Sequence, residues 1–178
     1  MAWMALLANA QTVGAQTAPE VLAPTEVATE LPGARLQGQG RLRYFGLHVY
    51  DALLWSSARI AAGATSDAEL ALELRYARSL RGPLIAERSI EEMKRVGDVS
   101  DTDGQRWFEA MKRIFPDVRE GDRITGVQRP GVGAWFFVNG KAVGELRDAA
   151  FARLFFGIWL SPRTSQPALR AALLGLPS

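Results

Sequence analysis

The 178-residue chain contains no cysteine and a single histidine, His48. Without thiols it has no disulfide, iron–sulfur cluster, thiolate zinc site or cysteine nucleophile. A serine triad would need His48 beside a serine and an acid, but the chain has no Gly-x-Ser-x-Gly motif. We therefore expect no metal, no cofactor and no catalytic role for His48.

Long hydrophobic runs and blocks of one charge are also missing. The apolar segment 149–160 is interrupted by Arg153, so no run reaches the roughly 20 residues of a membrane-spanning helix. The net charge is +2, with 21 Lys and Arg interspersed among 19 Asp and Glu. Such a pattern lacks the basic block of a nucleic-acid surface, so we expect neither a membrane span nor a nucleic-acid partner.

The amino-terminal residues differ in composition from the rest. Residues 1–10 form an apolar run that ends in Ala8-Asn9-Ala10, which fits the cleavage pattern of a secretory signal but lacks its basic start. This indicates a clipped signal peptide, with a plain apolar terminus as the alternative. Residues 11–31 are rich in Ala, Thr, Pro and Glu and predict a flexible leader. We expect a leader over 1–31, one domain over 32–178, and a periplasmic or secreted protein, with a cytoplasmic one as the alternative.

The segment 35–55 has the strongest strand signal and places arginine and tyrosine among apolar residues. Taken as one extended run, it has a packed face and a face with polar groups, namely Phe45, Leu47 and Val49 against Tyr44, His48 and Tyr50. A buried arginine beside a tyrosine hydroxyl is costly unless an anion or a hydrogen-bonding group meets it. A ligand carboxylate and an internal Asp or Glu both satisfy this requirement, and both stay open.

Helix and strand signals follow in alternation. Residues 68–76 alternate as a half-buried strand, and residues 83–96 gather their apolar positions on one helical face. Thr102 with Gln105 suits the capping box of a second helix, which Pro116 stops. Glu91 and Glu92 are adjacent on the first helix and point about 100° apart, so they are a poor catalytic carboxylate pair.

The last third of the chain predicts a hairpin and two further helices. Asn139-Gly140 between apolar segments is a strong hairpin signal and favours antiparallel pairing. Asp148 suits the amino-terminal cap of a third helix, and Gly175 closes a short one that begins at Pro167. The chain therefore predicts an α+β fold in which helices cover an antiparallel sheet.

The order of these motifs resembles one family, the bacterial chalcone isomerase-like proteins, which are related to plant chalcone isomerase and to plastid fatty-acid-binding proteins. The resemblance covers residues 36–175 and rests on Gly38-x-Gly40, Val49–Ala52, Leu72–Tyr76, Glu87–Met93, Phe115–Val118, Gly121–Arg123 and Phe155–Pro162. It implies an open-faced β-sandwich, in which a long antiparallel sheet is covered on one side by helices and a ligand cleft lies between sheet and helices.

The resemblance also implies site residues. In the fatty-acid-binding members an arginine after the glycine pair and a tyrosine on the next strand hold the ligand carboxylate; these roles would fall to Arg41 or Arg43 and to Tyr50. In true chalcone isomerases the covering helix presents a tyrosine, a lysine and an asparagine. The matching positions here are Ile85, Arg88 and Glu92, a stripe at i, i+3 and i+7. Loss of the phenol argues against the isomerase reaction.

Three hypotheses follow from the sequence. The first is a non-catalytic binding protein for a fatty acid or a similar amphiphilic carboxylate, with Arg41, Arg43, Tyr50, Ile85, Arg88 and Glu92 as ligand-binding residues. The second is an intramolecular lyase of the chalcone isomerase type that acts on a phenolic substrate. The third is an envelope interaction protein with a residual cleft. The first agrees best with the residues, and none of the three identifies the ligand or the oligomeric state.

Overall fold

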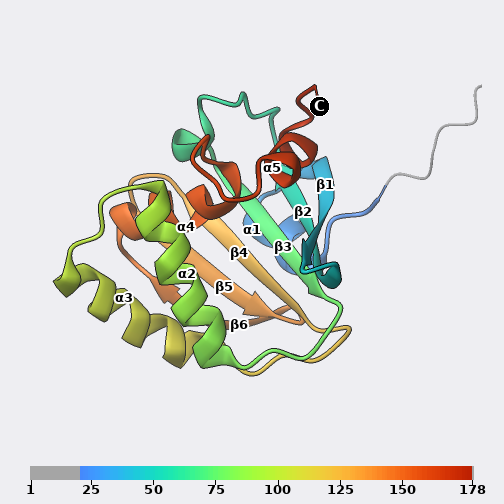
Figure 1. Cartoon of the computed structure of the whole chain (residues 1–178). Coiled ribbons are helices and arrows are strands. Elements are labelled where there is room, and N and C mark those ends of the chain that lie inside the picture. Colours follow the sequence, from blue (N-terminus) through green and yellow to red (C-terminus); the bar gives the residue numbers. More distant parts are fainter. Residues whose placement is uncertain (1–20, 178) are drawn as a thin grey trace, which may run out of the picture.

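The structure, a computed structural model, describes residues 21–177 and contains one mixed α+β unit (Figure 1). The predicted signal peptide over residues 1–10 lies outside the described residues. Six strands form one sheet whose order follows the chain, and all neighbours are antiparallel: β1 Arg35–Tyr44, β2 Leu47–Ser56, β3 Leu70–Tyr76, β4 Arg123–Arg129, β5 Gly133–Val138 and β6 Lys141–Leu146. The helices are α1 Thr25–Glu30, α2 Gly82–Val96, α3 Asp101–Ile114, α4 Ala149–Leu160 and α5 Pro167–Leu174, with a 3₁₀ turn at Thr65–Asp67.

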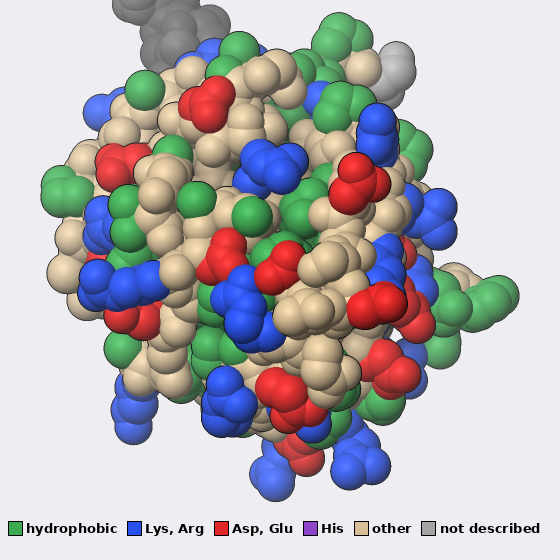
Figure 2. All heavy atoms as spheres, turned by 90° about the vertical axis from the view of Figure 1, so that its left-hand side faces the viewer, with side chains coloured by type: hydrophobic (Ala, Val, Ile, Leu, Met, Phe, Trp, Pro, Cys, Tyr) green, Lys and Arg blue, Asp and Glu red, His purple; other side chains and the backbone are tan. Residues whose placement is uncertain are grey.

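The outer surface carries both signs of charge. Figure 2, which views the side of the molecule that carries α3, shows acidic and basic side chains interspersed around small hydrophobic patches. Many of these charges are paired along one helix, as in Lys112 with Glu109 at 3.0 Å and Arg106 with Asp103 at 2.8 Å. Within residues 21–177, no helix combines the length and the apolar character needed to cross a bilayer.

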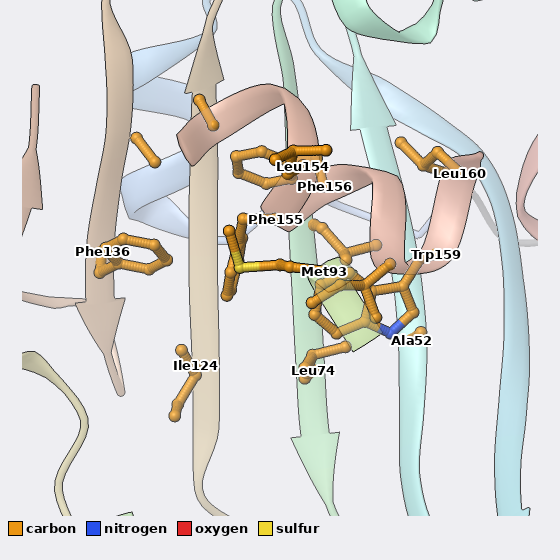
Figure 3. Close-up of a cluster of buried hydrophobic side chains, with 14 of the residues drawn as sticks. Ala52, Leu74, Met93, Ile124, Phe136, Leu154, Phe155, Phe156, Trp159 and Leu160 are labelled. Atoms are coloured by element: carbon orange, nitrogen blue, oxygen red, sulfur yellow. The ribbon is translucent and has the colours of Figure 1, made fainter. Parts of the chain in front are cut away.

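Helices α2 to α5 cover one face of the sheet and enclose the main hydrophobic core. The side chains of α4 point toward the strands, and Phe155 lies with its ring centroid 5.3 Å from that of Phe136 on β5 (Figure 3). Met93 of α2 is fully buried beside them. Residues 70, 72, 74 and 76 of β3 contribute to the same core, because alternate side chains of a strand share a face. The α+β fold predicted from the sequence is confirmed.

Helix α1 packs on part of the opposite face of the sheet, so the predicted flexible leader is wrong for residues 25–31. Val27 is fully buried and Leu31 is 2% exposed, and both pack with Trp55 and other residues of the outer face. The Glu26 carboxylate accepts hydrogen bonds from Arg123 at 2.9 Å and from Thr125 at 3.0 Å. This cover also explains why β3 is buried on both faces, although its alternation predicted a half-buried strand.

Most of the predicted helix ends and turns agree with the structure. The Asp148 carboxylate accepts a hydrogen bond from the amide of Phe151 and caps α4. Gly175 closes α5 with a left-handed φ of 64°. The predicted cap at Thr102 is wrong, because Ser100 caps α3 by accepting a hydrogen bond from the Asp103 amide. A serine two residues earlier serves as well as a threonine, so composition alone does not choose between them.

The segment 35–55 is a tight hairpin, and its interpretation as one extended run is wrong. Phe45 and Gly46 form a two-residue turn with φ angles of 46° and 77°, both in the left-handed region. Phe45 and Leu47 point into solvent, 87% and 55% exposed, and do not line a packed face. A register shift between Leu42 and Arg43 changes the alternation again close to the turn.

Candidate functional site

A cavity of about 360 Å³ lies between the β1–β2 hairpin, the end of β3, the first half of α2 and the end of α4. Its wall is predominantly apolar, and it includes Leu42, Val49, Leu74, Leu80, Leu84, Ile85, Phe115, Ile124, Phe155 and Ile158. The polar side chains in the wall are Tyr44, Tyr50, Tyr76, Arg78, Arg88, Ser89, Glu92, Trp159, Ser165 and Gln166. An apolar cavity with a few polar groups is typical of a site for a small organic ligand.

Two buried phenols meet at the sheet side of the cavity. Tyr50 of β2 pairs with Tyr76 of β3, and their rings are in edge contact with centroids 5.8 Å apart. The Tyr50 oxygen accepts a hydrogen bond from the Trp159 indole nitrogen at 2.9 Å. Burial raises the pKa of both phenols, so both keep their protons at neutral pH. Among residues 21–177 neither O–H group donates to a protein acceptor, so both can donate to a ligand.

The helix stripe predicted from the sequence lines the cavity as a group. Ile85, Arg88 and Glu92 of α2 are all in its wall. Arg88 pairs with the Glu92 carboxylate and donates a hydrogen bond to Glu91 at 3.0 Å. Glu92 is 5% exposed and has a second cation, Arg95, with its Nε 3.6 Å from Glu92 Oε2. The arginines balance the charge of Glu92, and Arg88 is already occupied by carboxylates.

Arg41 and Arg43 are not in the cavity wall, so the prediction that one of them faces the ligand there is wrong. Arg41 lies opposite Asp51 on the other face of the sheet and donates to its carboxylate at 2.7 Å. Hydrogen bonding from Arg41 lowers the pKa of Asp51. Arg43 is exposed near the turn and donates to the Gly46 carbonyl at 3.3 Å. The sequence left open whether a ligand carboxylate or an internal acid meets the arginine. For Arg41 the partner is the internal acid Asp51.

Other residues of the wall are not among the predicted ligand-binding residues. Tyr76 stands in the alternation of β3, but its contact with Tyr50 depends on the register between two strands. Trp159 reaches Tyr50 across 109 positions of sequence. Arg78 follows Tyr76 by two residues, lines the cavity and has no ion pair within residues 21–177. A lone arginine after a strand carries no signal of its own, because its role depends on where the chain turns.

Within residues 21–177, no group of three or more His, Asp or Glu side chains is arranged to hold a metal ion. The second cavity, of about 270 Å³, lies between the 3₁₀ turn and α4 and includes Gln128 and Arg153. The Gln128 amide nitrogen donates to the carbonyls of Thr65 and Ala68, both at 2.8 Å, so its main role is to hold that loop.

Comparisons with known proteins agree with the fold. A solved structure, a fatty-acid-binding protein of Arabidopsis thaliana, superposes with a TM-score of 0.62 over 80% of this chain and 87% of the other, at 15% identity. An uncharacterized protein of Haemophilus influenzae is 30% identical over 146 residues, which is 81% of this chain and 70% of the relative. The model of the chalcone isomerase-like family matches residues 15–175. The chain therefore belongs to the chalcone isomerase-like family.

Proposed function

We propose that the protein binds an amphiphilic carboxylate of the fatty-acid type, with the hydrocarbon chain in the cavity between the hairpin, α2 and α4. The observation that carries the proposal is the apolar wall around a volume of about 360 Å³. Sites for small organic ligands begin at about 300 Å³. Burying a hydrocarbon chain there stabilises the complex by roughly 0.8 kcal/mol per methylene group. The fold shared with a fatty-acid-binding protein of Arabidopsis thaliana supports the same class of ligand.

The carboxylate end of the ligand meets Arg78 and the phenols. Arg78 lines the cavity and has no carboxylate partner among the described residues, in contrast to Arg88. Tyr76 precedes it by two residues on the strand face that turns toward the cavity, and Tyr50 lies against Tyr76. One guanidinium and two O–H donors provide the charge-assisted hydrogen bonds that a carboxylate needs. The family resemblance implied Arg41 or Arg43 with Tyr50 for this role, and the arginine proposed here is Arg78.

The residues of the cavity wall favour binding without catalysis. Ile85 stands at the helix position where the family resemblance places the tyrosine of true chalcone isomerases. Glu92 forms ion pairs with Arg88 and Arg95. Without a phenol at that position, the wall lacks the group that would organise a chalcone for cyclisation. Purified protein should therefore not accelerate the cyclisation of a chalcone above its spontaneous rate, and measurable turnover would favour the lyase hypothesis instead.

Calorimetric titration with hexadecanoate tests the proposal. We expect micromolar or tighter binding, and weaker binding of hexadecanol, which has the same chain without the charge. Arg78→Gln should weaken hexadecanoate binding by about 1 to 2 kcal/mol, roughly 5- to 30-fold, and should leave hexadecanol unchanged. The matched control is Arg81→Gln, an exposed arginine outside the cavity wall. Absence of heat with fatty acids of several chain lengths would rule the proposal out.

We propose further that the domain is exported. The support is the apolar run over residues 1–10 with its Ala8-Asn9-Ala10 cleavage pattern. Cleavage after Ala10 would leave α1 attached to the sheet, because α1 begins at Thr25. Expression of the gene, followed by fractionation and amino-terminal sequencing, should give periplasmic protein that begins near Gln11. An intact amino terminus in the cytosol would contradict export.

A further inference from the structure

The turn between β1 and β2 presents apolar side chains to solvent beside the cavity. Phe45 is 87% exposed and Leu47 is 55% exposed. Tyr44 and Leu84, 55% and 53% exposed, also line the cavity, so the apolar surface continues from the turn into the cavity mouth. These four, here called the apolar tip, are half of the eight large hydrophobic side chains exposed within residues 21–177. Such a concentration marks an interaction surface.

The backbone at Phe45 is unfavourable for its side chain. In the described chain, the non-glycine residues with positive φ are Phe45 and Asn139, at 46° and 49°. Each is the first residue of a two-residue turn and is followed by glycine, Gly46 and Gly140. Asparagine is the preferred residue at this place, and a bulky aromatic is rarely found there. Local strain of this kind concentrates at functional positions, which makes the exposed ring a candidate for binding.

Three arginines lie in the two segments that carry the apolar tip. The segments 42–48 and 77–84 contain Arg43, Arg78 and Arg81 and no Asp or Glu. The two segments are adjacent, because the Ala77 amide donates to the Val49 carbonyl at 2.9 Å. None of the three arginines forms an ion pair within residues 21–177. Asp117 lies against the second segment, where its carboxylate accepts a hydrogen bond from the Gly82 amide at 2.8 Å. Three arginines against this one carboxylate leave an excess of positive charge beside the apolar tip.

We propose that the apolar tip docks on the surface of an anionic lipid bilayer, with Phe45 and Leu47 at the boundary between headgroups and acyl chains. Aromatic and leucine side chains with arginines beside them match this boundary, where the arginines meet lipid phosphates. The cavity opens at the same surface through Tyr44 and Leu84. This inference rests on the proposed function in one respect: the docked orientation gives an amphiphile a short path between bilayer and cavity.

Vesicle flotation tests the docking. Wild-type protein should float with vesicles of phosphatidylcholine and phosphatidylglycerol, and less with phosphatidylcholine alone. The affinity of the double variant Phe45→Asn with Leu47→Ser for the anionic vesicles should be lower by at least about tenfold, because the variant removes two apolar contacts with the acyl chains. Asparagine suits the left-handed turn, so this variant keeps the fold. The matched control is Val132→Ser, which removes a 48% exposed valine from the β4–β5 turn at the other end of the sheet.

The arginines are tested in the same assay. Arg43→Gln with Arg81→Gln should weaken binding to the anionic vesicles and reduce its sensitivity to salt, because each arginine near the surface contributes an electrostatic attraction. Neither residue is in the cavity wall. The matched control is Arg153→Gln on α4, an exposed arginine that lines the second cavity and not the first. It should leave vesicle binding unchanged.

Hexadecanoate titration without vesicles separates docking from ligand binding. Phe45 and Leu47 are not in the cavity wall, so their double variant should keep the wild-type affinity for hexadecanoate. Vesicle binding that depends on the tip, without any hexadecanoate binding, would support docking and contradict the proposed function. Docking is overturned if the wild-type protein does not float with anionic vesicles, or if the double variant floats as well as wild type does.

Discussion

At the scale of single residues, Phe45 and Asn139 allow an internal comparison of two turns in one sheet. Both have a positive φ and precede a glycine with a positive φ. Asparagine tolerates this conformation, and other non-glycine residues lose about 1 to 2 kcal/mol. Phe45→Asn alone should therefore raise the free energy of unfolding by about 1 kcal/mol, measured by urea denaturation. A decrease would show that the Phe45 ring stabilises the fold, and would remove the argument that it is kept for binding.

Glu26 links the acid stability of the protein to the contact between α1 and the sheet. Burial by itself raises the pKa of this carboxyl, but hydrogen bonds from Arg123 and Thr125 more than offset it, so the pKa is lowered from 4.5. A carboxyl with a lowered pKa stabilises the fold above the unfolded value, and this contribution is lost as the pH falls below about 4.5 toward the folded value.

The corresponding variant is Glu26→Gln. At neutral pH it should lower the free energy of unfolding by about 1 to 3 kcal/mol, because the Arg123 guanidinium loses its charged acceptor. Between pH 5 and 3 the variant should lose less stability than wild type, and the two curves should approach each other. Urea denaturation at several pH values measures both effects. The control is Glu87→Gln on the exposed side of α2; a wild-type pH dependence in Glu26→Gln would contradict the assignment.

The residues of the cavity show how far sequence alone reaches. Tyr50, Ile85, Arg88 and Glu92 were predicted as ligand-binding residues, and all four line the cavity. Their role with a ligand stays a prediction. Arg41 points the other way, because the register of β1 with β2 places it opposite Asp51. Strand alternation says that neighbours face opposite sides, but it does not say which side is covered by helices.

At the scale of elements, two glycines of β1 allow α5 to pack closely on the sheet. A Cβ atom at Gly38 would collide with the backbone carbonyls of Ala172 and Leu173 in α5. At Gly40 it would press on the Leu169 side chain, with 2.7 Å to its Cδ1. The glycine pair therefore has a backbone role, which is to allow the close approach of α5.

Gly38→Ala should therefore lower the free energy of unfolding by about 2 kcal/mol or more, since a backbone carbonyl cannot move aside as a flexible side chain does. Gly63→Ala is the matched control, because its Cβ would meet no atom within 4 Å. Thermal and urea denaturation of both variants measure the difference. Equal stabilities would show that α5 shifts at little cost.

Helices and turns with a local chemical signal were predictable, and elements that depend on tertiary contacts were not. The caps at Asp148 and Gly175 and the Asn139-Gly140 turn are encoded within a few residues. The Phe45-Gly46 turn was missed, because phenylalanine does not signal a tight turn. Helix α1 was missed because six residues without an apolar period form a helix only when the sheet covers them.

At the scale of the whole molecule, the sheet separates two environments with different roles. One face carries α1 and a network in which Glu73, fully buried, accepts hydrogen bonds from Trp55 and Arg75. The other carries the helices that enclose the core and the cavity. The order of motifs in the sequence predicted this fold, and the family match confirms the resemblance. The cavity was not predictable in detail, since it depends on how α2, α4 and the hairpin meet.

The most direct test of the central claim uses Trp159 as a reporter inside the cavity. Trp159 is the tryptophan of the cavity wall, while Trp55, Trp107 and Trp135 of the described chain lie elsewhere. Bromine quenches indole fluorescence only on close contact. We expect a dibrominated octadecanoate to quench the wild-type protein and the control variant Trp135→Phe to a similar extent, and to leave Trp159→Phe almost unquenched. Equal quenching of Trp159→Phe, or no quenching of the wild-type protein, would contradict a fatty-acid site in this cavity.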